Sequence, residues 1–402
     1  MNILKREKQY ENLKNLLNNS KEELHKNTYP LKASHLRAVY NSFTINNAYK
    51  KDSLVALTGE EFPQEILFAL SIIPIDLQSM CAMLARSNSD VLNNCYRQMD
   101  NINMSKDICS NIRSSFSVAF ADILPEPNMV FGNSIPCDGF SKLAYYISKM
   151  YDCTFLFLDT PDANDEKSIA YLSKQIENSF YDIVKNFNLK WDVIDILKTI
   201  RYSNEAKKYY LATLDLVKKY QLQSVQNELY ELVVANLWGA KELVNVTKTL
   251  YQEALKLSEV ASNNKKRILW IGQVPNYAYK FLDYLYDNVD VIYFASFKDE
   301  IVTLLDEKNP YESMAKRLIS CSWNPFRRYD IITNICKNYN VDGVILQNPW
   351  GCRNLLGVTN ILRTMLTKNK VKCLTIDADF MDREKFAYSQ VVNRCTAFFE
   401  ML

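Results

Sequence analysis

Residues 129–159 read MVFGNSIPCDGFSKLAYYISKMYDCTFLFLD, and this stretch decides the predicted fold. Residues 129–132 and 154–159 are short apolar runs typical of buried strands, and a helical pattern lies between them from about Phe140 to Met150. A strand, a helix and a second strand at this spacing predict a βαβ unit, whose two strands run parallel. The sequence therefore predicts a parallel sheet, with Cys137 in the loop after the first strand.

Strand-like runs recur on both sides of this stretch. Residues 61–75 predict a short helix, with a proline near its first turn, and then a strand. Toward the C-terminus, four apolar runs predict further strands, which begin at Arg267, Val289, Val341 and Lys372. The chain therefore contains two βα-rich halves.

The two halves are separated by residues 165–260, which contain almost no glycine or proline and have a helical pattern. Turns are expected within this region near residues 190, 203 and 222. The predicted division of the α/β chain is an N-terminal helical arm over 1–50, a first α/β domain over 51–200, a helical connector over 201–262 and a second α/β domain over 263–402.

Composition excludes several classes of function. The chain has 402 residues, of which 48% are hydrophobic and 23% charged, and its net charge is +2. The sequence has no basic stripe of the kind that nucleic-acid binding requires. The longest apolar runs are too short and too interrupted to span a bilayer. The N-terminus is charged and lacks an apolar signal core, so we expect a cytoplasmic protein with no nucleic-acid or membrane partner.

Cysteine and histidine usage narrows the chemistry further. The ten cysteines of a cytoplasmic chain are expected to be reduced thiols. The sequence contains no Cys-x-x-Cys pair, which argues against a zinc ribbon and against a thioredoxin-like motif. The two histidines, His25 and His35, both lie near the N-terminus, which disfavours histidine-rich metal sites and most histidine acid–base mechanisms. Glycine-rich nucleotide loops and phosphate loops are absent from the sequence.

Three cysteines lie in loops suited to holding a ligand. Cys137 and Cys352 follow predicted strands, and open parallel sheets bind ligands beyond the carboxyl ends of their strands. Cys109 lies at or near the start of a predicted helix, and Trp350 could shield the site from solvent. Three thiolates without a nearby histidine suit an iron–sulfur cluster with one open position, whereas structural zinc requires four closed ligands.

Each of these cysteines also has a purely structural interpretation, as a small residue in a turn or a buried thiol. We interpret the remaining seven as structural thiols, namely Cys81, Cys95, Cys153, Cys321, Cys336, Cys373 and Cys395. Arg327 and Arg328 could bind phosphate or carboxylate, or could simply begin a solvated helix.

Several short segments, taken in order, resemble a known family. They are Phe62–Ile66 leading to Pro74-Ile75, Ile108-Cys109-Ser110, Pro136-Cys137-Asp138, Phe157–Pro161, Val341–Ile345 followed by Trp350–Arg353, and Thr375–Asp379 with Arg383. Together they cover roughly residues 60 to 400. The set is similar to the subunits of 2-hydroxyacyl-CoA dehydratases and benzoyl-CoA reductases, including the D-component of 2-hydroxyglutaryl-CoA dehydratase.

The resemblance implies two Rossmann-like parallel-sheet domains with a [4Fe–4S] cluster between them. It implies Cys109, Cys137 and Cys352 as the three protein ligands of that cluster. It further implies a second homologous subunit in a homodimer or heterodimer, and an ATP-dependent iron–sulfur activator that injects one low-potential electron. The expected reaction is elimination of water from a 2-hydroxyacyl-CoA through a radical, with the thioester carbonyl bound at the open iron.

The subunit role stays open at this point, because the chain departs from the family in its low glycine content, its N-terminal arm and its loop 347–350. One subunit type binds substrate at its cluster and the other relays electrons. The alternatives are therefore a dehydratase subunit, a related reductase subunit acting on aromatic acyl-CoA or a small molecule, and a non-catalytic electron-relay subunit. The remaining alternative is a cluster-free α/β protein with buried thiols.

Overall fold

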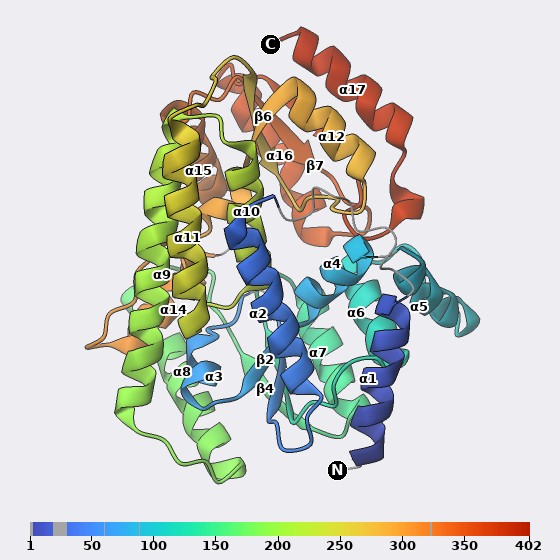
Figure 1. Ribbon diagram of the computed structural model, residues 1–402, viewed down its shortest axis with the longest axis vertical. Helices are drawn as coiled ribbons and strands as arrows, with labels where there is room; N and C mark the ends of the chain where they lie inside the picture. The colour runs from blue at the N-terminus through green and yellow to red at the C-terminus, as the bar shows by residue number, and fades with distance from the viewer. Residues whose placement is uncertain (1–2, 19–29, 60, 88, 322–323) are drawn as a thin grey trace.

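The computed structural model describes residues 3–18, 30–59, 61–87, 89–321 and 324–402 (Figure 1). His25 lies outside the described residues. The first sheet has the strand order β2-β1-β3-β4, and all neighbouring strands are parallel. Its strands are β1 (Val55–Thr58), β2 (Ile73–Asp76), β3 (Met129–Asn133) and β4 (Thr154–Leu158). The parallel βαβ unit expected from residues 129–159 is therefore confirmed.

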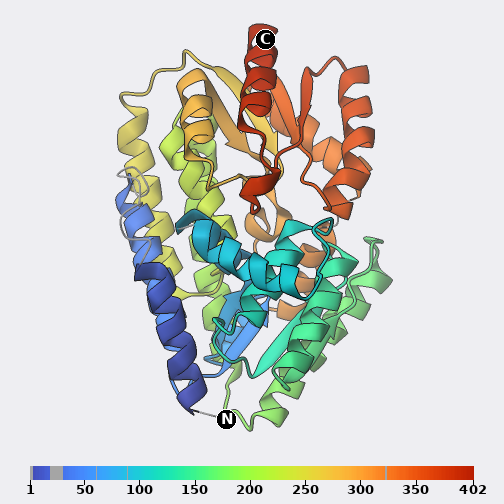
Figure 2. The same ribbon diagram turned by 90° about the vertical axis from the view of Figure 1, so that its right-hand side faces the viewer.

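The second sheet repeats this arrangement, with the strand order β6-β5-β7-β8 and parallel neighbours throughout. Its strands are β5 (Lys266–Ile271), β6 (Val289–Tyr293), β7 (Gly343–Gln347) and β8 (Cys373–Ile376). Two Rossmann-like parallel-sheet domains follow, as expected. In Figures 1 and 2 the domains are stacked along the long axis, with the chain termini at opposite ends.

Helices cover both faces of each sheet. In the first half they are α1 (Ile3–Asn18), α2 (Lys32–Ala48), α3 (Glu65–Ala69), α4 (Leu77–Ser87), α5 (Ser89–Asn101), α6 (Ser110–Phe120), α7 (Asp138–Met150) and α8 (Glu166–Asn186). In the second half of the chain they are α12 (Tyr279–Asn288), α13 (Asp299–Val302), α14 (Pro310–Ser320), α15 (Pro325–Asn338), α16 (Arg353–Lys368) and α17 (Tyr388–Glu400), with the short 3₁₀ turns η1 (Phe294–Phe297) and η2 (Arg383–Lys385). Of these, α14 packs against α8 in the core on one face of the first sheet.

Burial on both faces explains why the strands are continuous apolar runs rather than alternating ones. In β1, Leu57 packs into the core on one face of the first sheet, and the adjacent Ala56 packs into the core on the other. In β5, Leu269 and Ile268 divide in the same way between the two cores of the second sheet.

In sequence, the two domains are separated by the helices α9 (Val193–Lys219), α10 (Gln223–Ala235) and α11 (Lys241–Ser258), and Figure 1 shows α9 and α11 along one side of the molecule. The turns near 190 and 222 are confirmed, but the turn near 203 is wrong, because α9 is continuous through residues 200–204. Ser203 and Asn204 are residue types that favour turns in isolation. In the helix, the Ser203 hydroxyl donates to the buried Glu65 carboxylate, and the Asn204 amide donates to the Leu305 carbonyl at 2.8 Å.

The N-terminal helices are fastened to the rest of the molecule. The Glu253 carboxylate of α11 accepts hydrogen bonds from the backbone N–H groups of Lys32 and Ala33 at 2.8 and 2.9 Å, which caps the start of α2. The buried Arg6 guanidinium of α1 donates to the Glu126 carbonyl at 2.7 Å. None of the helices in the described part of the chain has the length and apolar character needed to cross a bilayer.

Candidate functional site

Three cysteines occupy equivalent local positions, each at the residue immediately before a helix. Cys109 precedes α6, Cys137 precedes α7 and Cys352 precedes α16. All three line one cavity of about 90 Å³ between the two sheet domains. The structure therefore brings together the three cysteines that the sequence analysis singled out.

Two of these cysteines share a topological position as well. Cys137 follows β3, the third strand of the first sheet, and Cys352 follows β7, its counterpart in the second sheet. The two loops are joined, since the Asn354 side-chain amide donates to the Pro136 carbonyl and the Arg353 guanidinium pairs with the Asp138 carboxylate at 3.2 Å.

Gly351 allows the Cys352 loop to approach Cys109. Its φ of +76° lies in the left-handed region. A Cβ at this position would lie 2.5 Å from the Ile108 carbonyl carbon and 2.7 Å from the Cys109 backbone nitrogen. Only glycine fits both the conformation and this close backbone contact.

The electrostatics of the three thiols differ. A hydrogen bond between the Cys109 and Cys352 side chains raises the pKa of Cys109 and lowers that of Cys352. Burial raises the pKa of Cys137. For each sulfur, backbone N–H groups two and three residues later lower the pKa, although no cysteine makes a close capping hydrogen bond.

The other described cysteines have the character of core thiols. Burial raises the pKa of most of them to about 11 or 12, namely Cys81, Cys95, Cys153, Cys336, Cys373 and Cys395. Cys321 is buried and its thiol donates to the Arg317 carbonyl at 3.3 Å. Arg327 and Arg328 lie in the first turn of α15 and donate to the Ile319 and Cys321 carbonyls at 2.7 and 2.5 Å. These backbone contacts favour a structural role, but the expected solvated helix start is wrong for Arg328, which is buried.

The three thiols do not close around a single point. Among the described residues, no group of three or more His, Cys, Asp or Glu side chains could hold one metal ion. In an iron–sulfur cluster each thiolate binds a different iron, so its ligands are spread more widely than those of a single ion. Three soft sulfur donors around one cavity therefore fit a cluster better than they fit zinc.

Away from the cysteines, the cavity has mostly apolar walls with one internal ion pair. Lys298 Nζ lies 3.2 Å from Glu61 Oε1, and both side chains are buried. The apolar walls include Tyr230, Phe294 and Phe380. Trp350 is not among the described lining residues and is 60% exposed, so the expectation that it shields the site is wrong.

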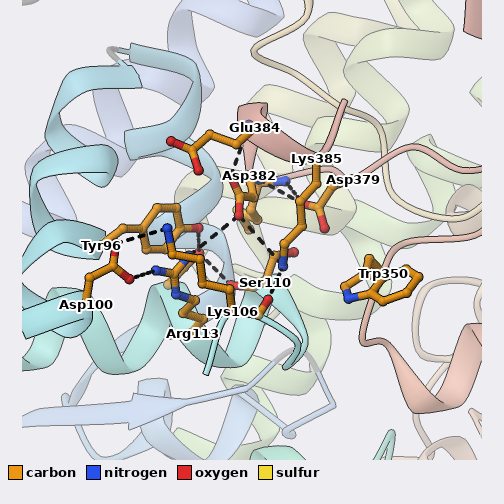
Figure 3. Close-up of polar contacts among 12 residues, drawn as sticks. Tyr96, Asp100, Lys106, Ser110, Arg113, Trp350, Asp379, Asp382, Glu384 and Lys385 are labelled. Atoms are coloured by element: carbon orange, nitrogen blue, oxygen red, sulfur yellow. Dashed lines mark hydrogen bonds and ion pairs between the residues drawn. The ribbon is translucent and has the colours of Figure 1, made fainter. Parts of the chain in front are cut away.

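A buried polar network fastens the second domain to α6, next to Cys109 (Figure 3). The Arg113 guanidinium pairs with Asp100 at 2.6 Å and with Asp382 at 3.6 Å, and it stacks 4.5 Å from the centre of the Tyr96 ring. Asp382 belongs to the segment after β8, whereas Arg113 is in α6. Arg113 therefore links the two domains.

Further contacts of the same network reach the cysteine loops. Burial raises the pKa of Asp379, and the adjacent Ser110 hydroxyl partly offsets this rise. The Trp350 indole N–H donates to the Asp107 carboxylate at 3.3 Å. Lys385 donates to the Lys106 carbonyl at 2.6 Å (Figure 3).

Sequence reasoning gave no role to Arg113, Asp379 or Asp382. The available signal was a pair of aspartates three residues apart directly after a predicted strand, in the same position relative to its strand as the cysteine loops. Arg113 gave no signal of its own, because an arginine in a helix is usually exposed.

The family model of the 2-hydroxyglutaryl-CoA dehydratase D-component matches residues 61–402. The matched region contains the three cavity-lining cysteines and begins after β1. A comparison with curated proteins finds no match.

Proposed function

Since the chain belongs to the family of the 2-hydroxyglutaryl-CoA dehydratase D-component, we propose that it is the iron–sulfur subunit of an activator-dependent 2-hydroxyacyl-CoA dehydratase. The observation that carries this proposal is the convergence of Cys109, Cys137 and Cys352 on one cavity, each at a helix N-terminus. A hydro-lyase of this kind removes water from the thioester of a 2-hydroxy acid.

In the proposal, Cys109, Cys137 and Cys352 hold a [4Fe–4S] cluster. When bound, a cluster with three protein thiolates supplies low-potential electron transfer and one iron open to an oxygen ligand. The helix N-termini place partial positive charge near each sulfur, which favours the thiolate form needed for binding. Of the three thiols, Cys352 is the one whose pKa is lowered, chiefly by its hydrogen bond with Cys109.

The remaining lining residues have a separate role, which is to keep the cavity apolar. Tyr230, Phe294 and Phe380 line the same cavity as the cysteines and contribute apolar surface to it. Low polarity strengthens electrostatic interactions with a bound thioester. This apolar part of the cavity favours a substrate-binding subunit over a subunit that only relays electrons.

The partners in the proposal are a second homologous subunit, in a homodimer or heterodimer, an ATP-dependent iron–sulfur activator and an acyl-CoA substrate. Membership of the D-component family supports them. A related benzoyl-CoA-type or small-molecule reductase subunit would have the same cysteine set, so product analysis separates the two.

The test is iron and acid-labile sulfide per chain on anaerobically purified protein, with an EPR spectrum after reduction. We expect about four irons and four sulfides. Replacing Cys109, Cys137 or Cys352 by serine should lower the iron content, whereas the matched control Cys395→Ser should retain it, because Cys395 is a core thiol. Full iron in all four variants, or no iron after reconstitution, would refute the proposal.

Activity is then measured with a 2-hydroxyacyl-CoA and an activator of the same family under anaerobic conditions. Formation of the enoyl-CoA supports the dehydratase. Reduction of an aromatic acyl-CoA in its place would assign the chain to a reductase, and cluster loading without thioester binding would assign it to electron relay.

A further inference from the structure

We propose that the cavity beside the three cysteines receives the acyl end of the substrate, and that this acyl group ends in an uncharged, apolar group rather than a carboxylate. The inference rests on the proposed function, because it assumes a 2-hydroxyacyl thioester. It is based on the walls of the cavity and on their balance of charge.

The apolar walls come from four separate elements. Val233 and Val234 belong to α10, Phe294 to η1 and Leu355 to α16, while Phe380 follows β8. These side chains are buried or partly buried and present carbon to the cavity. An aliphatic or aromatic group gains free energy by replacing water against such a surface.

The charges that face the cavity already compensate each other. Among the described residues that line it, Glu61 and Lys298 are the two that carry charge. They are 3% and 6% exposed, and their ion pair measures 3.2 Å. A substrate carboxylate bound at Lys298 would have to compete with Glu61, leaving two carboxylates near one ammonium group away from water.

The neutral lining continues into a second, smaller cavity. The two cavities share Gln78, Tyr230, Val234, Gln273 and Phe380. Among the described residues, those lining the smaller cavity carry no charge. Amide side chains such as Gln78 can donate hydrogen bonds to a hydroxyl or carbonyl group, but they cannot neutralise a carboxylate. Both chambers therefore select against a terminal negative charge.

The experiment compares two thioesters that differ only at the end of the acyl chain. In 2-hydroxy-5-methylhexanoyl-CoA an isopropyl group replaces the terminal carboxylate of 2-hydroxyglutaryl-CoA at nearly equal size. The CoA part is identical, so the ratio of the two dissociation constants reports the acyl end alone. Binding is measured anaerobically by equilibrium dialysis on protein of known iron content.

We expect the apolar thioester to bind at least about 100-fold more tightly, since burial of an uncompensated carboxylate is costly. The variant Gln78→Lys adds an ammonium group to the walls of both chambers and should shift the ratio at least about tenfold toward 2-hydroxyglutaryl-CoA. The matched control Gln78→Met adds no charge and should leave the preference for the apolar thioester in place.

Equal binding of the two thioesters, or tighter binding of 2-hydroxyglutaryl-CoA to the unmodified protein, would overturn the inference. Iron-loaded protein that binds neither thioester would also overturn it, while leaving the cysteine assignment intact. Absence of iron is a failure of the proposed function itself, and the iron measurement identifies that outcome separately.

Discussion

Gly351 is the position where a single methyl group should separate the two cysteine loops. In Gly351→Ala, the added Cβ would lie 2.5 Å from the Ile108 carbonyl carbon, whereas ordinary contact begins at 3.4 Å, so the loops must move apart by about 0.9 Å. A binding constellation tolerates displacements of only about 0.5 Å. The positive φ of +76° adds backbone strain of about 1–2 kcal/mol for alanine.

Overlap and strain together predict a loss of about 2–4 kcal/mol in the free energy of unfolding and a lower iron content. The assays are urea denaturation of the unloaded protein and iron per chain after anaerobic reconstitution. Gly357→Ala in α16 is the matched control, because a Cβ there meets nothing within 4 Å. Alanine within a helix should raise the stability by about 0.5–1 kcal/mol and leave iron unchanged.

Iron content and stability equal to those of the unmodified protein in Gly351→Ala would refute this reasoning, since the Cys109 and Cys352 loops would then not depend on close contact. A loss of iron in Gly357→Ala as well would show that the assay responds to any change near the site.

Two further predictions concern buried ion pairs. Burial alone would raise the pKa of Glu65, but the Arg317 guanidinium lowers this pKa to about 2, below the usual 4.5. The pair therefore contributes stability above about pH 4.5, and this contribution is lost as the pH falls toward 2. Glu65→Gln should lower the free energy of unfolding by about 3–5 kcal/mol, measured by urea denaturation at pH 7. Glu307→Gln, which breaks the exposed pair with Arg201, should lower it by under about 1 kcal/mol. Equal losses in the two variants would contradict a stabilising buried pair. Arg113→Met leaves Asp382 without its partner in the other domain. This variant should show faster amide hydrogen exchange in α6 and in the segment after β8, measured by mass spectrometry. Unchanged exchange would argue against a link between the domains through Arg113.

The parts of the fold that depend on local pattern could be predicted from the sequence. The unit β3-α7-β4 was predicted because its apolar runs and helical period are contained within residues 129–159. The turn near residue 203 was wrong because Ser203 and Asn204 are turn formers in isolation, and their partners Glu65 and Leu305 are distant in sequence.

The same distinction between local pattern and distant contacts applies to the candidate site. Cys137 and Cys352 could be located because both follow strands, and Cys109 because it lies near the start of a predicted helix, while the family resemblance implied that the three act together. The contact of Arg113 with Asp382 could not be predicted, because it joins residues from different domains and depends on how those domains pack. Trp350 was misjudged for the same reason, since nothing in its local sequence shows that its indole faces Asp107 at the surface.

The division of the three cysteines between the two domains has a consequence for biosynthesis. Cys109 and Cys137 belong to the first domain, and Cys352 emerges from the ribosome more than 200 residues after Cys137. The core on one face of the first sheet also includes α14, so the first domain is complete only after residues 310–320 have been translated, and β7 and α16 follow later still. Under the proposed function, metal delivery is therefore a late, post-translational event, and a chain that terminates early cannot mature into a loaded protein.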